Sequence, residues 1–232
     1  MTKNMNFSVI IPAYLEEENL QIILPELQEE IAKITKEYEV LVIDTMKSKD
    51  NTKDVCSKHG AVYINREHGD NYGDAIVTGI KYAKGEYVLF MDADGSHSPF
   101  FIKNLYKYKD EYDVVIASRY VEGGSTDNSS VLILMSKVVN ILYSVILNLK
   151  CKDVSNSFKL YKGQQLKKLN LKCQNFDVVE EILFKLNKHN KNLSIKEIPF
   201  AFKKRMFGST KRNLFAFIFS YLVTILKLRF GK

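Results

Sequence analysis

Short runs of β-branched and aromatic residues alternate with longer amphipathic segments through the first half of the chain. The short runs predict strands at residues 7–11, 40–43, 62–64, 87–91 and 114–117. The segments between them have helical length and periodicity, at residues 17–36, 52–58, 74–83 and 100–106. This alternation predicts an α/β fold in which a mainly parallel, doubly wound, Rossmann-like sheet carries helices on both faces.

Size and composition are those of a globular protein. A length of 232 residues suits one domain with a substantial core, and 46% of the residues are hydrophobic and 26% charged. The three cysteines have neither the spacing of a disulfide framework nor that of a zinc site, and the N-terminal apolar run is too short for a signal peptide. We therefore expect a protein of the reducing cytoplasm.

The net charge of +7 is concentrated near the C-terminus. From Ala201 onward there are eight Lys or Arg and no Asp or Glu, so the first 200 residues hold 26 basic against 27 acidic side chains. A basic segment of this kind binds phosphate groups, anionic lipid or nucleic acid. No zinc-finger, RNA-recognition or helix-turn-helix signature accompanies the charge, so we expect no nucleic-acid partner.

Two later segments, 131–149 and 214–226, are predicted to be strongly apolar helices. The second has thirteen residues without a charge and would extend over about 20 Å, short of the ~30 Å hydrocarbon core of a bilayer. Five basic residues lie between positions 203 and 212, and this combination suits a helix in the plane of an anionic membrane surface. The alternatives are packing in the core for the first helix, and in the core or a dimer interface for the second.

Candidate site residues follow four of the predicted strands. Because the carboxyl ends of parallel strands meet at one edge of the sheet, we expect the active site there. The residues concerned are Pro12, Ala13 and Tyr14 after the first strand, Asp44 after the second, Asp92 and Asp94 after the fourth, and Arg119 after the fifth.

Asp92 and Asp94 give the strongest local signal. They end a buried apolar strand, where two carboxylates repel each other and lose solvation unless a cation lies between them. Oxygen ligands favour Mg²⁺ or Mn²⁺, and a nucleotide diphosphate supplies further oxygens. The alternative is a strand-end turn in which Asp94 or Ser96 caps the next helix.

Five motifs occur in a fixed order along the chain: SVIIPAYLEEEN at 8–19, VID at 42–44 with DNT at 50–52, DAD at 92–94, SRY at 118–120 with GG at 123–124, and RMFGSTK at 205–211. In this order they resemble the inverting family 2 glycosyltransferases and, within that family, the polyprenol-phosphate (dolichol-phosphate) mannosyltransferase branch. The resemblance implies an A-type glycosyltransferase fold, a nucleotide-sugar donor and a divalent metal, Mg²⁺ or Mn²⁺.

The resemblance also implies roles for single residues. Donor binding falls to Pro12, Ala13, Tyr14, Glu16, Asp44 and Asp92, and metal binding to Asp92, Asp94 and Ser96. Phosphate or acceptor binding falls to Arg119, Lys137, Arg205 and Lys211, and the catalytic set comprises Asp94, Arg119 and Glu181. The catalytic domain would span residues 1–212, with a nucleotide-sugar half to about 120 and an acceptor half from about 121, and the interfacial helix 213–232.

The chain departs from the family pattern at three positions. Thr45 stands where the family has a second Asp after Asp44, and Leu132 stands where an Arg is expected, with Lys137 as its substitute. Lys159 replaces an Arg, which weakens any bidentate phosphate contact. His97 beside the Asp pair is interpreted as a residue at a helix start rather than a metal ligand.

The predicted reaction moves a hexose, of mannose or glucose type, from a nucleotide diphosphate sugar to a polyprenyl phosphate with inversion. A lipid phosphate is already an anion near neutral pH and can attack unaided, whereas a sugar hydroxyl needs a general base such as Glu180 or Glu181. A hydroxyl acceptor therefore remains the alternative. A non-catalytic binding module is more distant because it would not explain the carboxylate pair. A nucleotidyltransferase would carry a Gly-rich basic loop where this chain has Pro12, Ala13 and Tyr14.

Overall fold

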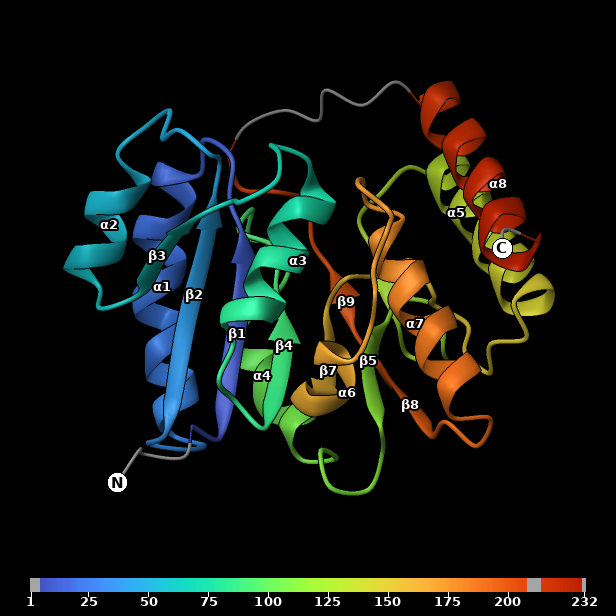
Figure 1. Ribbon diagram of the computed structural model, residues 1–232, viewed down its shortest axis with the longest axis horizontal. Coiled ribbons are helices and arrows are strands. Elements are labelled where there is room, and N and C mark those ends of the chain that lie inside the picture. Colours follow the sequence, from blue (N-terminus) through green and yellow to red (C-terminus); the bar gives the residue numbers. More distant parts are fainter. Residues whose placement is uncertain (1–4, 208–213, 231–232) are drawn as a thin grey trace.

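The computed structural model describes residues 5–207 and 214–230 (Figure 1). A seven-stranded sheet in the order β3-β2-β1-β4-β7-β5-β8 runs through this part of the protein. Its strands are β1 (Phe7–Pro12), β2 (Tyr38–Asp44), β3 (Val62–Asn65), β4 (Tyr87–Phe90), β5 (Val114–Ser118), β7 (Lys159–Lys162) and β8 (Ile195–Pro199). All five predicted strands are confirmed, and all described pairs in this sheet are parallel except those that β7 forms with β4 and β5.

Helices cover both faces of the sheet, as predicted (Figure 1). One face packs on α1 (Glu17–Ala32), α2 (Thr52–Lys58) and α4 (Ile102–Tyr106), which the short η1 (Pro99–Phe101) precedes. The other face packs on α3 (Tyr72–Tyr82), α5 (Ser130–Ile146), α6 (Gly163–Lys167), α7 (Val178–His189) and α8 (Leu214–Phe230). Strand residues alternate between the two hydrophobic clusters, as a doubly covered sheet requires.

The antiparallel strand β7 was not predicted, and it shapes the candidate site. Because it runs against β4 and β5, its first residue lies at the edge where those two strands end. The segment 153–157 leads into β7 and therefore reaches this edge between Asp92 and Arg119. A second, two-stranded sheet of β6 (Ser125–Thr126) and β9 (Ala201–Phe202) follows the ends of β5 and β8.

The two predicted apolar helices pack side by side, as Figure 1 shows for α5 and α8. The ring of Tyr143 lies edge-on to that of Tyr221 with centroids 5.7 Å apart, and its hydroxyl donates to the Tyr221 carbonyl at 3.2 Å. Packing in the core therefore accounts for one side of α5. Among the described residues, no helix has the length and apolar character needed to cross a membrane.

Candidate active site

The loop after β4 carries Asp94 in a tight turn. The backbone N–H and the hydroxyl of Ser96 donate to Asp94 Oδ1 at 3.0 and 2.6 Å. Burial acts to raise the pKa of Asp94, but the bonds from Ser96 and the nearby positive charge of Arg205 leave it below its ordinary value. Gly95 takes a φ of +80°, and a Cβ there would lie 2.6 Å from Met206 Cγ, so glycine is needed for the close approach. Asp94 is therefore held as an anion.

Asp92 lies two residues away and is held by two hydroxyls. Tyr72 donates to Oδ1 at 3.2 Å and Ser157 to Oδ2 at 3.1 Å. Its backbone N–H donates to Nδ1 of His97 at 2.9 Å, which places the proton of the neutral imidazole on Nε2. His97 is buried against Phe158, the rings stacking at 4.6 Å, and burial lowers its pKa. It lies just before η1, near the helix start expected for it.

Arg205 brings the C-terminal basic segment to the Asp pair. Its Nη2 donates to Asp94 Oδ2 at 2.9 Å, and the N–H of Met206 donates to the Asp94 carbonyl at 2.8 Å. The Arg205 side chain is one-third exposed at 34%, so it remains accessible to a ligand. Lys211, the other predicted phosphate ligand, lies outside the described residues.

Glu16 belongs to the same electrostatic environment as the Asp pair. Burial is the main cause that raises its pKa to about 7; a hydrogen bond from Asn19 at 2.5 Å opposes this, and the charges of Asp94 and Asp92 add to it. The segment that follows β1 thus brings Glu16 close enough to Asp92 and Asp94 for their charges to act on it.

The other predicted donor-binding residues surround the ends of β1 and β2. Asp44 is buried and accepts the Tyr63 hydroxyl at 2.9 Å and the Thr45 N–H at 2.7 Å. The buried guanidinium of Arg66 donates to the Ala13 carbonyl at 2.5 Å. By contrast, Tyr14 is 45% exposed and available to a ligand.

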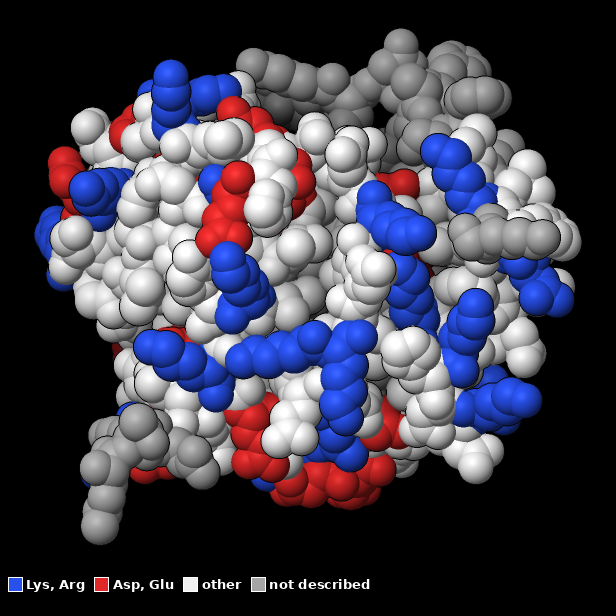
Figure 2. Space-filling view, viewed as in Figure 1, with Lys and Arg blue, Asp and Glu red and all other residues white. Residues whose placement is uncertain are grey.

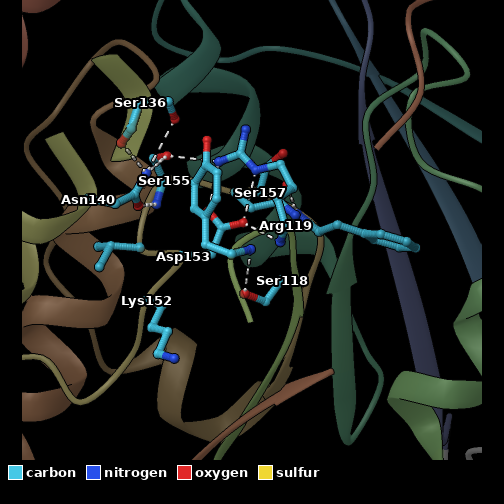
Figure 3. Close-up of polar contacts among 12 residues, drawn as sticks. Ser118, Arg119, Ser136, Asn140, Lys152, Asp153, Ser155 and Ser157 are labelled. Carbon is cyan, nitrogen blue, oxygen red and sulfur yellow. Dashed lines mark hydrogen bonds and ion pairs between the residues drawn. The ribbon is translucent and has the colours of Figure 1, made fainter. Parts of the chain in front are cut away.

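Arg119 lies on the other side of segment 153–157 and forms a buried ion pair. Its Nε and Nη2 donate to the two carboxylate oxygens of Asp153 at 2.9 and 2.7 Å, and Nη2 also reaches Ser155 at 3.1 Å (Figure 3). Burial acts against the charged form, but Asp153 leaves the pKa of Arg119 above its ordinary value. Asn140 of α5 joins the network by donating to Ser155 Oγ at 3.0 Å (Figure 3).

Lys137 and Arg119 approach the same aromatic ring. The ammonium of Lys137, exposed on α5, lies 5.9 Å from the ring centroid of Tyr120, and the guanidinium of Arg119 lies 5.0 Å from it. Leu132, which replaces the expected Arg, is 38% exposed on the same helix. Two cations therefore lie around Tyr120 on the α5 side of the sheet edge.

Glu181 is fully engaged by its own neighbourhood. Its buried carboxylate accepts the backbone N–H of Lys172 at 2.9 Å and of Cys173 at 2.8 Å, and it pairs with Lys185 at 2.6 Å. The expectation of a catalytic Glu181 is therefore not supported, because these contacts use both oxygens.

Glu180 is buried in the core. Within the described part of the chain, neither of its carboxylate oxygens has a hydrogen-bond partner, and burial raises its pKa to about 8 despite the nearby charge of Lys159. The ammonium of Lys159, also fully buried, donates to the Val154 carbonyl at 2.6 Å, and burial lowers its pKa to about 8. Lys159 thus fixes segment 153–157 through the Val154 carbonyl, and its buried ammonium is not accessible to a ligand.

The oxygen atoms around the Asp pair suit a hard divalent cation. Asp92, Asp94 and Ser96 provide two carboxylates and a hydroxyl in one loop, and the hydroxyls on Asp92 leave lone pairs on both of its oxygens. No cluster of three or more His, Cys, Asp or Glu suited to a metal occurs among the residues that the structure describes. The remaining ligands of an ion here would come from substrate or water, which is typical of Mg²⁺.

Sequence reasoning missed Tyr72 and Ser157, the two hydroxyl partners of Asp92, and the pairing of Asp153 with Arg119. Tyr72 precedes the predicted start of its helix by two residues, and Ser157 precedes an unpredicted strand. For Ser157 and Asp153, the available signal was the segment 153–159, in which Lys159 stands where the family has an Arg.

The family described as glycosyl transferase family 2 matches residues 8–169. Dolichol-phosphate mannosyltransferase of Pyrococcus furiosus is 32% identical over 97% of this chain and 64% of its own length. Undecaprenyl-phosphate mannosyltransferase of Micrococcus luteus is 29% identical over 90% of this chain and 88% of its own length. The chain thus spans less than two thirds of the P. furiosus relative.

A solved structure of glucosyl-3-phosphoglycerate synthase from Mycobacterium tuberculosis, in complex with Mn²⁺, uridine diphosphate and phosphoglyceric acid, has the same fold. It superposes with a TM-score of 0.75 at 15% identity, covering 98% of this chain and 79% of that one. This likeness confirms the predicted A-type fold, and the relatives confirm the predicted resemblance to polyprenol-phosphate mannosyltransferases. The chain therefore belongs to glycosyl transferase family 2.

Proposed function

We propose that this protein transfers a hexose, of mannose or glucose type, from a nucleotide diphosphate sugar to a polyprenyl phosphate, with inversion. The observation that carries the proposal is the arrangement of charge at one sheet edge. Asp92 and Asp94 lie at the end of β4 with Arg205 beside them, and Arg119 lies at the end of β5 across segment 153–157. The names of the P. furiosus and M. luteus relatives support the lipid-phosphate acceptor.

The donor would bind on the β1–β4 side of the edge. Pro12, Ala13, Tyr14 and Glu16 would line the nucleotide pocket, with Asp44 toward the base or ribose. Asp92, Asp94 and the Ser96 hydroxyl would hold Mg²⁺ or Mn²⁺. A bound ion would neutralise the charge that develops on the leaving diphosphate. Arg205 would donate from its partly exposed guanidinium to the phosphates, together with Lys211, because a guanidinium fork matches phosphate oxygens well.

The acceptor would approach from the α5 side. Arg119 is fixed by Asp153 and Ser155, so it offers an oriented positive charge, and Lys137 provides a second, movable one. A lipid phosphate needs no general base to attack the anomeric carbon. Both oxygens of Glu181 accept hydrogen bonds from the backbone. This supports a phosphate acceptor, because such an acceptor needs no base at that position.

The apolar helices would touch a membrane at its cytoplasmic face. One side of α5 packs on the protein, but Val131, Leu134, Val138, Ile141 and Val145 recur every three or four residues and are between 48% and 74% exposed. No acidic residue occurs between positions 128 and 152 or after 200. Lys and Arg side chains lie beside α5 and α8 in Figure 2. An exposed apolar stripe with positive neighbours suits the surface of an anionic bilayer.

A donor panel tests the first half of the proposal. Thermal shift and hydrolysis would be measured with GDP-mannose, UDP-glucose and other nucleotide sugars, each with and without Mn²⁺. One nucleotide sugar should stabilise the protein, and more strongly with Mn²⁺. If none binds under either condition, the proposed donor class is wrong.

A further inference from the structure

The carboxylate of Asp92 is fixed by two distant parts of the chain. Ser157 donates to one oxygen and Tyr72 to the other, at 3.1 and 3.2 Å. Tyr72 is the first residue of α3, so the position of its ring depends on what fixes the start of that helix. At the residue before Tyr72, the N–H of Asn71 donates to the Asp74 carboxylate at 3.1 Å, as in a capping box.

The segment 172–176, which leads into α7, packs on this helix start. Phe176 stacks on the ring of Tyr72 with centroids 4.0 Å apart and planes 19° from parallel. The N–H of Gly73 donates to the Gln174 carbonyl at 2.7 Å. A Cβ on Gly73 would lie 2.4 Å from the Cys173 carbonyl oxygen, so only glycine permits this contact.

Two carboxylates, the buried one of Glu181 and the half-buried one of Asp177, hold the segment at both ends. Glu181 accepts the N–H groups of Lys172 and Cys173. Asp177 accepts the N–H of Asn175 at 3.1 Å and the hydroxyl of Thr224, in α8, at 2.6 Å. A charged acceptor with two backbone donors makes a strong anchor, since charge-assisted hydrogen bonds are shorter and stronger than neutral ones. A continuous set of contacts thus connects Glu181 with Asp92 through Phe176 and Tyr72.

We propose that Tyr72 is a positioning residue for Asp92, and that segment 172–176, anchored by Glu181, sets the orientation of Tyr72. The proposal rests on the proposed function only in assigning an ion to Asp92. A hydroxyl that donates to a ligating carboxylate restricts its rotation and so preorganises the ion site. This gives Glu181 an indirect structural task instead of the proton transfer that its sequence position suggests.

The first test uses two phenols of the same helix. Tyr72→Phe removes the hydroxyl on Asp92 and keeps the ring that stacks on Phe176. Tyr82→Phe is the matched control, because the hydroxyl that it removes donates to the carboxylate of Glu67, at 2.7 Å, and not to Asp92. Mn²⁺ affinity would be measured by electron paramagnetic resonance, with and without UDP and GDP, and melting without metal. We expect Tyr72→Phe to weaken Mn²⁺ binding about 10-fold, with Tyr82→Phe unchanged and both melting temperatures close to that of the wild type.

A second variant tests the anchor. Glu181→Gln replaces one acceptor oxygen by an NH2 group, which cannot accept from the backbone N–H groups of Lys172 and Cys173. Amide hydrogen exchange in segment 172–176 should therefore accelerate, and Mn²⁺ binding should weaken. Normal Mn²⁺ affinity in Tyr72→Phe, or faster exchange in Glu181→Gln without any loss of Mn²⁺ affinity, would overturn the proposal. A loss confined to nucleotide affinity would assign Tyr72 to the donor and overturn it too. A wild type that binds no Mn²⁺ under any condition would instead overturn the proposed metal and, with it, this inference.

Discussion

Arg205 donates to Asp94 across 111 positions of sequence, at 2.9 Å. A guanidinium predicted to contact phosphate thus pairs with a carboxylate predicted to bind the metal. Both partners are charged and partly accessible, since Arg205 is 34% and Asp94 15% exposed. The pair can therefore exchange for stronger contacts when a cation reaches Asp94 and a diphosphate reaches Arg205.

Arg205→Ala should weaken donor binding, because it removes a charge-assisted contact worth roughly 1.5–3 kcal/mol, or about 10- to 100-fold in KM. Lys204→Ala, at the neighbouring exposed position, is the control. Steady-state kinetics with varied nucleotide sugar would check this. Wild-type kinetics in both variants would show that Arg205 does not contact the donor and contributes only surface charge.

Asp92→Ala and Asp94→Ala should each reduce transfer by roughly 100-fold or more, because each removes a proposed ligand of the ion that would stabilise the leaving group. Melting temperatures should change little, since the relief of repulsion between the two carboxylates offsets the hydrogen bonds that each replacement removes. Chelation should inactivate the wild type, and added Mn²⁺ or Mg²⁺ should restore it. Full activity of both variants in excess chelator would refute the metal assignment.

The buried Glu180 should make folding stability depend on pH. Its pKa in the folded protein is about 8, above the ordinary 4.5, so the folded state binds the extra proton and stability falls as pH rises between these values. Lys159, with its pKa lowered from 10.5 to about 8, acts in the opposite direction only above pH 8. Glu180→Gln cannot titrate and should remove a loss on the order of a few kcal/mol between pH 5 and 8.

Urea unfolding at several pH values between 5 and 8 would measure this effect. Glu111→Gln, at an exposed position, is the matched control and should keep the wild-type slope. The same slope in Glu180→Gln as in the wild type would mean that another group causes the pH dependence.

Membrane contact should depend on the exposed side of α5. Leu134→Asp and Ile141→Asp, at positions 65% and 61% exposed, should each weaken flotation with anionic liposomes about 10-fold, since a buried Leu or Ile contributes about 1.5–3 kcal/mol. Ile22→Asp on α1, at a position 41% exposed, should not. Flotation of the wild type should also fall at high salt. If no variant and no salt concentration changes flotation, α5 does not face the membrane.

Local pattern predicted the first half of the fold well, because each strand from β1 to β5 is a short apolar run and four of them lead directly into candidate site residues. The antiparallel β7 escaped prediction because its four residues, Lys159–Lys162, begin and end with lysine and do not look like a buried strand. Lys159 is nevertheless fully buried, because the backbone carbonyl of Val154 accepts a hydrogen bond from it and the carboxyl group of Glu180 lies nearby. Only the tertiary structure brings these groups together.

The candidate site was predicted in the same uneven way. The Asp pair and Arg119 could be located from strand ends alone. Their partners could not, because Ser157 and Asp153 reach them only through the direction of β7. For Glu181, sequence position suggested a base, whereas in the structure three donors contact its two carboxylate oxygens.

The identity of the acceptor tests the proposed function most directly. The purified protein would receive its preferred nucleotide sugar, Mn²⁺ and, in separate reactions, a short-chain polyprenyl phosphate, the matching polyprenol without phosphate, and a soluble glycan. We predict sugar transfer to the polyprenyl phosphate alone, because its anionic oxygen attacks without a base and meets Arg119 and Lys137. Transfer to the polyprenol or the glycan, with none to the polyprenyl phosphate, would contradict the lipid-carrier function and show a hydroxyl-directed glycosyltransferase.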